Sequence, residues 1–346
     1  MKALCSALLG LVTALSLSTQ AFADLRVGFI GGFSGPGKAF GDAARNGFEL
    51  AREEFGPQHI TVIYEDDQFD PKKTVGAFTK LVHTDKVDLI VVLGSTPAAT
   101  IAPLAEKKGI PTVAWASAEQ VAQGRRWTIR SWASGREEGR ALADKARELD
   151  LKRVATLAYT DEYALSVEQG FRSSFGSEAV SLGEVLATEQ DFASVILQAK
   201  GKGVDGIALC LSFGQGARFA KQMQQLNVKA TILGCETFNS SQEKELSQGA
   251  LKGAWFASVP VAAAFQSRYK DRFKVDTSIG GSAVHYELYR ILGEIAPSTP
   301  SQEQIRDKLL SVRGRESAVG RFDIIARDGD HWFNLPIGIH KVGEQG

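Results

Sequence analysis

The feature of this 346-residue chain that most constrains its fold is a regular alternation of short apolar runs with longer amphipathic stretches. Each apolar run precedes a segment whose apolar residues recur at helical spacing. Over 40–55, for example, Phe40, Ala44, Phe48 and Ala51 share one helix face. Strands that are apolar on both faces, each followed by a helix, are typical of a parallel sheet covered on both sides. The pattern therefore predicts an α/β fold.

The alternation runs in two series, with the second beginning after Trp132. The first series predicts strands at 25–30, 60–64, 89–93 and 112–115 and helices at 40–55, 72–82 and 97–108. The second predicts helices at 137–149, 163–175, 192–200 and 216–226 and strands at 153–159, 179–185, 206–211 and 229–233. Two similar series predict two similar domains with a cleft between them, and the chain length also suits two domains.

No low-complexity linker separates the two series, so short hinge segments are expected near 130–133 and 257–260. After the second hinge the pattern is helical again and then ends in apolar runs. We expect helices at 262–273 and 282–295 and closing strands at 320–323 and 335–340. A chain that crosses between its domains more than once makes a hinge rather than a flexible tether.

The N-terminus has the three parts of a secretory signal peptide: Lys2, an apolar run over 7–15, and Ala21-Phe22-Ala23 as an A-x-A end. The apolar run is too short for a membrane span, which needs roughly 20 residues. We expect residues 1–23 to be removed by cleavage after Ala23. The mature protein is then expected in the periplasm.

Composition excludes several classes of function. The 40 basic and 40 acidic residues balance, without the clustered positive surface that nucleic-acid binding needs. The five histidines are scattered, and neither a metal-ligand spacing nor a G-x-S-x-G elbow occurs. The glycine-rich stretch 31–37 lacks dinucleotide-loop spacing and includes Pro36, which indicates a turn that approaches a ligand or the facing domain. We expect no enzyme activity, no metal and no cofactor.

Cys210 and Cys235 each end a strand-like run, and one helical pattern joins those runs. An exported protein can form disulfides, but the Cα atoms must lie about 4.4–6.8 Å apart. Both a disulfide and two buried thiols are open, and the residues alone favour the thiols.

The segment around Ser95 is the strongest local candidate for a binding site. Ser95 and Thr96 end a predicted strand, directly before a helix that Pro97 opens. Free N–H groups and the helix dipole favour an anion there, and ligands of parallel sheets lie outside the strands' carboxyl ends. The alternative is an ordinary helix N-cap at Thr96.

Two further strand ends carry candidate residues. Backbone groups over 112–118 are positioned for a polar ligand, and Trp115 is either a pocket wall or core. Glu236 follows a strand of the second series, where a ligand ammonium would neutralise it; the alternative is a solvated loop glutamate. The acidic pairs at 66–67 and 161–162 are interpreted as solvated turns.

Several short motifs in a fixed order suggest a known family. They are Phe33-Ser34-Gly35-Pro36, Gly94-Ser95-Thr96, Gly109-Ile110-Pro111, Asp161-Glu162-Tyr163, Gly234-Cys235-Glu236 and His285-Tyr286-Glu287. Over essentially the whole mature length the chain resembles the type I periplasmic binding proteins of ABC importers, particularly the leucine/isoleucine/valine-binding family. The resemblance implies two Rossmann-like domains, parallel sheets flanked by helices, that three crossover strands join into a hinged clamp.

The implied lobes are 24–131 with 261–319 and 132–260 with 320–346. The implied partners are a small-molecule ligand and the permease subunits of an ABC importer in the inner membrane, with the binding protein a monomer. The same fold also serves sensors that report to a receptor, so a sensor is the alternative function.

The resemblance also assigns roles to residues. Ser95 and backbone groups at Ala116 and Ala118 would hold a ligand's α-carboxylate, and Glu236 would pair with its α-ammonium. Aromatic residues at Phe40, Tyr163 and Phe213 would flank the pocket. Ala118 stands where amino-acid binders usually have threonine, and Phe40 and Phe213 stand where tyrosine is common. We therefore expect an amino acid with a branched or other apolar side chain, with an aromatic carboxylate or short amide as the alternative.

Overall fold

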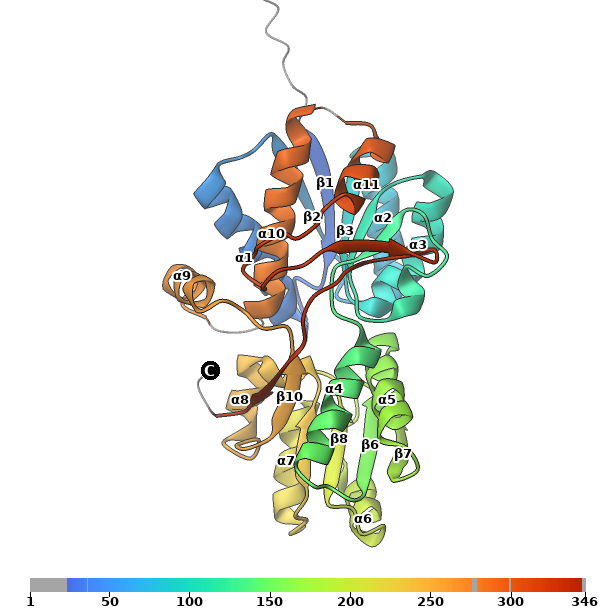
Figure 1. Cartoon of the computed structure of the whole chain (residues 1–346), viewed down its shortest axis with the longest axis vertical. Coiled ribbons are helices and arrows are strands. Elements are labelled where there is room, and N and C mark those ends of the chain that lie inside the picture. The colour runs from blue at the N-terminus through green and yellow to red at the C-terminus, as the bar shows by residue number, and fades with distance from the viewer. Residues whose placement is uncertain (1–23, 36, 276–278, 299, 344–346) are drawn as a thin grey trace, which may run out of the picture.

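The computed structural model of the chain describes residues 24–35, 37–275, 279–298 and 300–343, so the predicted signal peptide and Pro36 lie outside them. Figure 1 shows two lobes, each with a sheet between helices. The predicted α/β fold with two similar domains is confirmed.

The first lobe contains a seven-stranded sheet of order β11-β12-β5-β4-β3-β1-β2. Its strands are β1 (Leu25–Gly31), β2 (Ile60–Asp66), β3 (Leu89–Leu93), β4 (Thr112–Trp115), β5 (Thr128–Arg130), β11 (Ile324–Arg327) and β12 (Asp330–Phe333). Its helices are α1 (Lys38–Phe55), α2 (Pro71–His83), α3 (Ser95–Lys108), α9 (Ala263–Phe273), α10 (Ile279–Ile295) and α11 (Gln302–Leu310), with short 3-10 turns η1 (Glu119–Val121) and η3 (Ala296–Ser298). Alternate strand residues explain the two covered faces: Phe29 and Val91 pack with the core under α1 and α10, whereas Ile30 and Ile90 pack under α2 and α3.

The second lobe repeats this arrangement around a six-stranded sheet of order β13-β10-β9-β8-β6-β7. Its strands are β6 (Val154–Tyr159), β7 (Ala179–Val185), β8 (Gly206–Cys210), β9 (Thr231–Gly234), β10 (Trp255–Ser258) and β13 (Gly338–Lys341). Its helices are α4 (Gly135–Glu148), α5 (Glu162–Phe175), α6 (Ala193–Gly201), α7 (Gln215–Gln225) and α8 (Ser241–Ser247), with the 3-10 turn η2 (Glu236–Asn239) after β9. All neighbouring strands are parallel except β13, which pairs antiparallel with β10.

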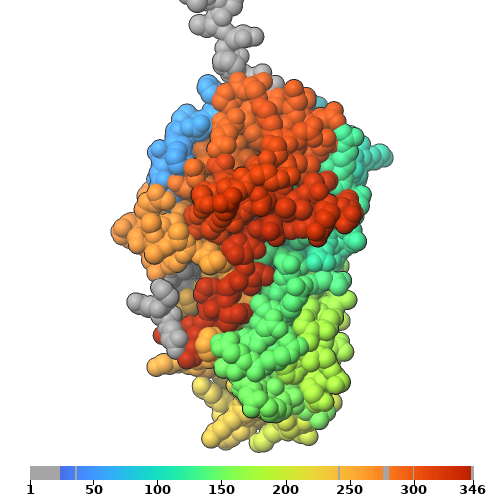
Figure 2. Space-filling view, in the orientation of Figure 1, coloured from blue at the N-terminus to red at the C-terminus, as the bar shows by residue number. Residues whose placement is uncertain are grey.

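The chain crosses between the lobes three times, after β5, after β10 and after β12. The first two crossings lie beside the predicted hinges. The third was predicted at 320, and that boundary is wrong, because β11 and β12 form an antiparallel hairpin at the edge of the first lobe's sheet. Ile324 and Phe333 are buried in the first lobe's core, so the apolar content of this hairpin holds it there. Figure 2 shows the C-terminal segment passing from the first lobe over the front surface to the second.

Smaller differences between the predicted and the observed strands concern very short elements. The predicted strand at 320–323 is reduced to one isolated bridge between Arg315 and Phe322. Strand β5 has only three residues, too few for a periodic signal. No helix in the described part of the chain has the length and apolarity of a membrane span.

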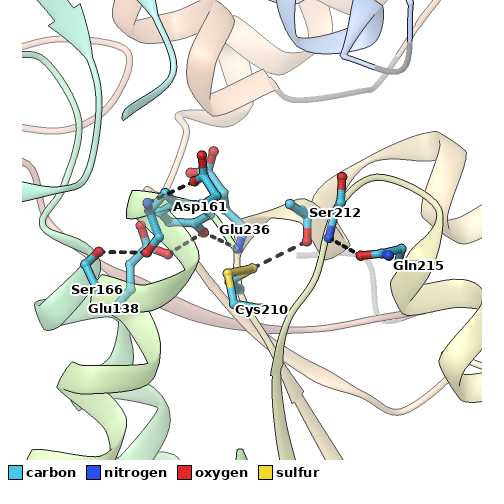
Figure 3. The surroundings of a disulfide bond; sticks show 10 residues. Glu138, Asp161, Ser166, Cys210, Ser212, Gln215 and Glu236 are labelled. Atoms are coloured by element: carbon cyan, nitrogen blue, oxygen red, sulfur yellow. Dashed lines mark hydrogen bonds between the residues drawn. A yellow bond between two sulfur atoms is a disulfide. The ribbon is translucent and has the colours of Figure 1, made fainter. Parts of the chain in front are cut away.

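Cys210 and Cys235 form a disulfide, so the preference for two thiols is wrong (Figure 3). The strand register explains the bond. β8 and β9 are parallel neighbours with Leu209 beside Gly234, which sets the next residue of each strand at the same level. The two Cα atoms are 5.1 Å apart, within the range that a disulfide spans.

The disulfide is predicted to stabilise the protein, because it closes a loop between residues separated by 25 positions in the chain. Replacing both cysteines by serine should lower the free energy of unfolding by about 2–4 kcal/mol. Urea unfolding of the wild type with and without reductant, beside the double variant, measures this. Equal stability of oxidised wild type and double variant would contradict the prediction.

Candidate functional site

A cavity of about 630 Å³ lies where the carboxyl ends of both sheets face each other across the lobes. Both lobes contribute to its lining. The first lobe contributes Gly37, Phe40, Gln68, Phe69, Gly94, Ser95, Thr96, Pro97, Trp115, Ser117 and, at the first crossing, Trp132. The second contributes Tyr159, Thr160, Asp161, Tyr163, Ala187, Thr188, Gln190, Ser212, Phe213, Glu236 and Thr237.

The first-lobe end of the cavity is polar and centres on Ser95. Ser95 begins α3, its N-cap is Gly94 at φ +92°, and no side chain caps this helix, so Thr96 is not the N-cap. The Ser95 hydroxyl oxygen accepts the backbone N–H groups of Ser117 at 3.1 Å and Ala118 at 3.2 Å. Because its oxygen is occupied as an acceptor, the hydroxyl is left to donate its own proton.

Ala116 and Ala118, whose backbone was predicted to meet the ligand, are buried and do not line the cavity. The Ala116 N–H donates to the Ala114 carbonyl at 2.8 Å, and the Ala118 N–H donates to Ser95. Ser117 lines the cavity between them. The ligand contacts of Ala116 and Ala118 therefore stay a prediction.

The lobes touch across the cavity. The Thr96 hydroxyl of the first lobe donates to the Asp161 carboxylate of the second at 2.6 Å. Phe40 and Phe213, on opposite lobes, have ring centroids 4.6 Å apart. These contacts describe a clamp whose two halves already meet.

Aromatic rings form most of the apolar wall. Trp115 stacks on Phe40 at 5.7 Å and packs edge-on against Trp132 at 5.5 Å. Trp115 is both core and wall, because it is 6% exposed and lines the cavity. Gly281 on α10 permits this position, since a Cβ there would lie 2.5 Å from the Trp115 ring.

The loop after β2 adds Gln68 and Phe69, which sequence reasoning missed. Asp66, predicted to be solvated, accepts N–H groups from Phe33, at 2.8 Å, and from Gln68. Asp67 is fully buried and accepts the Phe69 N–H at 2.9 Å, so this acidic pair shapes the loop. The loop sets Phe69 against the glycine-rich turn: a Cβ on Gly32 or Gly37 would lie within 2.5 Å of its ring.

The second-lobe end of the cavity is acidic. Tyr163, in the first turn of α5, donates its hydroxyl to Glu138 Oε2 at 2.9 Å and accepts the Glu236 backbone N–H at 3.1 Å. The Asp161 side chain caps α5 by accepting the Tyr163 N–H at 2.9 Å. Asp161 is therefore a helix cap and an inter-lobe contact.

Burial raises the pKa of both glutamates. The pKa of Glu236 is raised to about 8 by desolvation. Desolvation and the neighbouring Glu236 raise the pKa of Glu138 well above its ordinary value. Burial is more complete at Glu138, which is 1% exposed, than at Glu236, which is partly open to the cavity.

The structure brings together most of the predicted site residues. Those that line the cavity are Phe40, Ser95, Thr96, Trp115, Tyr163, Phe213 and Glu236. Other lining residues follow strands in the same way: Gln68 and Phe69 after β2, Thr160 after β6 and Ser212 after β8. The rule that ligands lie beyond the strands' carboxyl ends would have found them. Glu138 has no such signal.

The cavity combines a hydroxyl donor at one end, aromatic walls, and the acids Asp161 and Glu236 at the other. Such a site suits a small ligand with a carboxylate and an apolar body. Within the described residues, no group of three or more His, Cys, Asp or Glu side chains could hold a metal.

A smaller cavity of about 460 Å³ lies between the β11–β12 hairpin and the start of α4. Among its lining residues, Arg130 pairs with Asp330 at 3.1 Å, and Glu119 accepts the Ser134 hydroxyl at 2.7 Å. The inter-lobe cavity is larger and brings together most of the predicted site residues, so it is the candidate site.

Comparison with known proteins gives a consistent result. The model of a family described as periplasmic binding protein matches residues 24–343. A Leu/Ile/Val-binding protein from Citrobacter freundii is 26% identical over 244 residues, which cover 66% of this chain and 66% of the relative. The chain thus spans just under two thirds of the length of that relative.

Two solved structures share the fold. The branched-chain amino acid transporter substrate binding protein LivJ from Streptococcus pneumoniae, in complex with isoleucine, has a TM-score of 0.82 and 21% identity, covering 92% of this chain and 96% of that one. A solute binding protein of an ABC transporter from R. palustris, in complex with benzoate, has a TM-score of 0.81 and 18% identity, covering 92% and 93%. At these identities the likeness establishes the fold alone.

The raised pKa of Glu236 predicts how the stability of the ligand-free protein depends on pH. Between the ordinary value of 4.5 and about 8, the folded protein holds a proton that the unfolded chain has released. That proton favours folding at low pH, and its contribution is lost as pH rises through about 8. Wild type should therefore lose stability relative to Glu236→Gln between pH 5 and pH 8, approximately, as measured by urea unfolding. A pH-independent difference would contradict this.

Proposed function

The chain belongs to the periplasmic binding protein family, and from that premise we propose that it is the solute-binding component of an ABC importer. Its ligand is a small molecule with a carboxylate, first an amino acid with a branched or other apolar side chain, held in the cleft between the lobes. The family is one of binding proteins, in agreement with the expectation that the chain is not an enzyme.

The observation that carries the proposal is the polarity of the cleft. Ser95 and the start of α3 offer hydrogen-bond donors and a positive helix dipole to a carboxylate. Glu236 offers a carboxyl group to an ammonium at the other end. Phe40, Trp115 and Phe213 line the same cavity and offer apolar surface to a side chain. These features match the two charges and the body of an apolar amino acid.

A second ligand class is supported by the aromatic walls. An aromatic carboxylate could use Ser95 in the same way and stack on the rings of Phe40, Trp115 or Trp132. The fold relative with benzoate bound has the same architecture. The alternative ligand is therefore an aromatic acid or a short amide. The alternative function is that of a sensor, which would use the same binding to report to a receptor.

The proposed partner is the permease of the importer, and the proposed site of action is the periplasm. The N-terminal pattern of Lys2, the apolar run at 7–15 and Ala21-Phe22-Ala23 supports export. The contacts between lobes, such as that of Thr96 with Asp161, support a clamp that presents a closed form to a membrane partner.

Isothermal titration of refolded, ligand-stripped protein with isoleucine tests the amino-acid proposal. Glu236→Ala should weaken binding more than tenfold, because it removes the group that pairs with the ammonium. Ser95→Ala should weaken binding by about 1.5–3 kcal/mol, the range for a hydrogen bond to a charged group. Glu178→Ala, at an exposed position before β7, is the matched control and should bind as wild type.

Benzoate is titrated in parallel. Tight isoleucine binding that Glu236→Ala leaves unchanged would overturn the role of Glu236. Benzoate binding without isoleucine binding would replace the amino acid by the aromatic acid and keep the cleft. A protein that binds neither ligand, and no other amino acid or aromatic acid, would contradict the importer proposal.

A further inference from the structure

A second carboxyl group, that of Glu138, lies beside Glu236 at the acidic end of the cleft but does not line the cavity. Only Glu236, which follows β9, was predicted from the sequence. Glu138 lies in the first turns of α4 and is 1% exposed, while its neighbour Glu137 is exposed. Tyr163 connects the two residues, because its hydroxyl donates to Oε2 of the Glu138 carboxyl group and accepts the backbone N–H of Glu236. Figure 3 shows Glu138 and Glu236 reaching the same region from different elements.

Each acid has one buried oxygen without a hydrogen-bond partner, Oε1 of Glu138 and Oε2 of Glu236. The indole N–H of Trp132 lies beside both acids and favours their charged forms, but it is outside hydrogen-bond geometry. The other titratable groups facing the pair are Tyr159 and Asp161, neither of which brings a positive charge.

No Lys, Arg or His occurs among the described residues that line the cavity. Two buried carboxylates close together without a cation cannot both ionise near neutral pH, because each loses its hydration and repels the other. The upward shifts in the pKa values of Glu138 and Glu236 agree with this. At least one proton must therefore stay on the pair, and Glu138 is the more deeply buried member.

We propose that Glu138 is a positioning residue that keeps a proton and directs it toward Glu236, so that the acidic end carries one negative charge with an ammonium-bearing ligand and none with a plain carboxylate. This inference rests on the proposed function, whose site it deepens. A change in the protonation of Glu236 alone would then let the cleft bind a ligand of either class.

The proton balance follows directly. When a ligand ammonium binds, the Glu236 carboxyl loses its proton to solvent and the new carboxylate pairs with the ammonium, while Glu138 remains neutral. When a carboxylate without an ammonium binds at Ser95, both acids keep their protons. Tyr163 donates to Glu138 in each case, so the protonated Glu138 can use its free Oε1 toward Glu236.

Calorimetry of the wild type in buffers of different ionisation enthalpy measures the exchange. At pH 7, isoleucine binding should release about one proton and benzoate binding about none, because the pKa of Glu236 is about 8. Isoleucine affinity should rise about tenfold per pH unit up to about pH 8. Benzoate affinity should fall above that pH. Isoleucine binding without proton release would overturn the inference.

Substitutions at Glu138 distinguish the effect of its proton on isoleucine binding from the effects of its shape and its charge. Glu138→Leu removes the acceptor of Tyr163 and the donor to Glu236, and should weaken isoleucine binding at least tenfold and move its pH profile upward. Glu138→Gln keeps a neutral donor and should recover most of that loss. The matched control is Glu137→Gln on the exposed side of the same helix. A Glu138→Gln variant as weak as Glu138→Leu would show that Glu138 acts as a charge.

Infrared spectra test the inference without any ligand. The difference between wild type and Glu138→Gln at pH 7 should contain the C=O stretch of a protonated carboxyl, and the band should persist with isoleucine bound. The corresponding Glu236→Gln difference band should disappear on isoleucine binding. Absence of the Glu138 band in the ligand-free protein would refute the inference even if no tested ligand binds. Failure of the proposed function, in contrast, would leave the band in place.

Discussion

Glu236 lines the cleft, and the buried Glu138 lies close to it, with no cationic side chain among the described residues that line the cavity. Burying carboxyls in this way is unfavourable unless protons or a ligand neutralise them. Tyr163 connects the two residues, because its hydroxyl donates to the Glu138 carboxyl group and accepts the backbone N–H of Glu236. The Asp161 side chain, which caps α5, in turn accepts the Tyr163 N–H. Protons therefore neutralise the pair in the ligand-free cleft, and under the proposed function a ligand ammonium takes the place of the Glu236 proton.

The fold delivers these groups because parallel strands end at the cleft. The disulfide between Cys210 and Cys235 joins two of those strand ends, from which the segments carrying Phe213 and Glu236 emerge. It therefore fixes an apolar wall and the acidic end relative to each other. The chain crosses between the lobes three times, and Thr96 of the first lobe contacts Asp161 of the second across the cleft.

Sequence periodicity predicted the two lobes and most of their helices and strands, because fully apolar runs and helical stripes are local signals. Ser95 and Glu236 were predictable for the same reason: each directly follows a strand. Glu138 was not, since it stands beside Glu137 in an ordinary charged helix and only tertiary packing buries it. The β11–β12 hairpin and the disulfide both depend on which strands become neighbours and in which register they pair. Local sequence patterns do not determine either property.

The most direct test of this account is a crystal structure of the ligand-stripped protein soaked with isoleucine at neutral pH. We expect density for isoleucine in the inter-lobe cavity, with its carboxylate at Ser95, its ammonium at Glu236 and its side chain among Phe40, Trp115 and Phe213. Isoleucine bound in the opposite orientation, or in the smaller cavity beside Arg130, would contradict the assignment of the two polar ends. An empty cleft in a protein that binds isoleucine in solution would contradict the site itself.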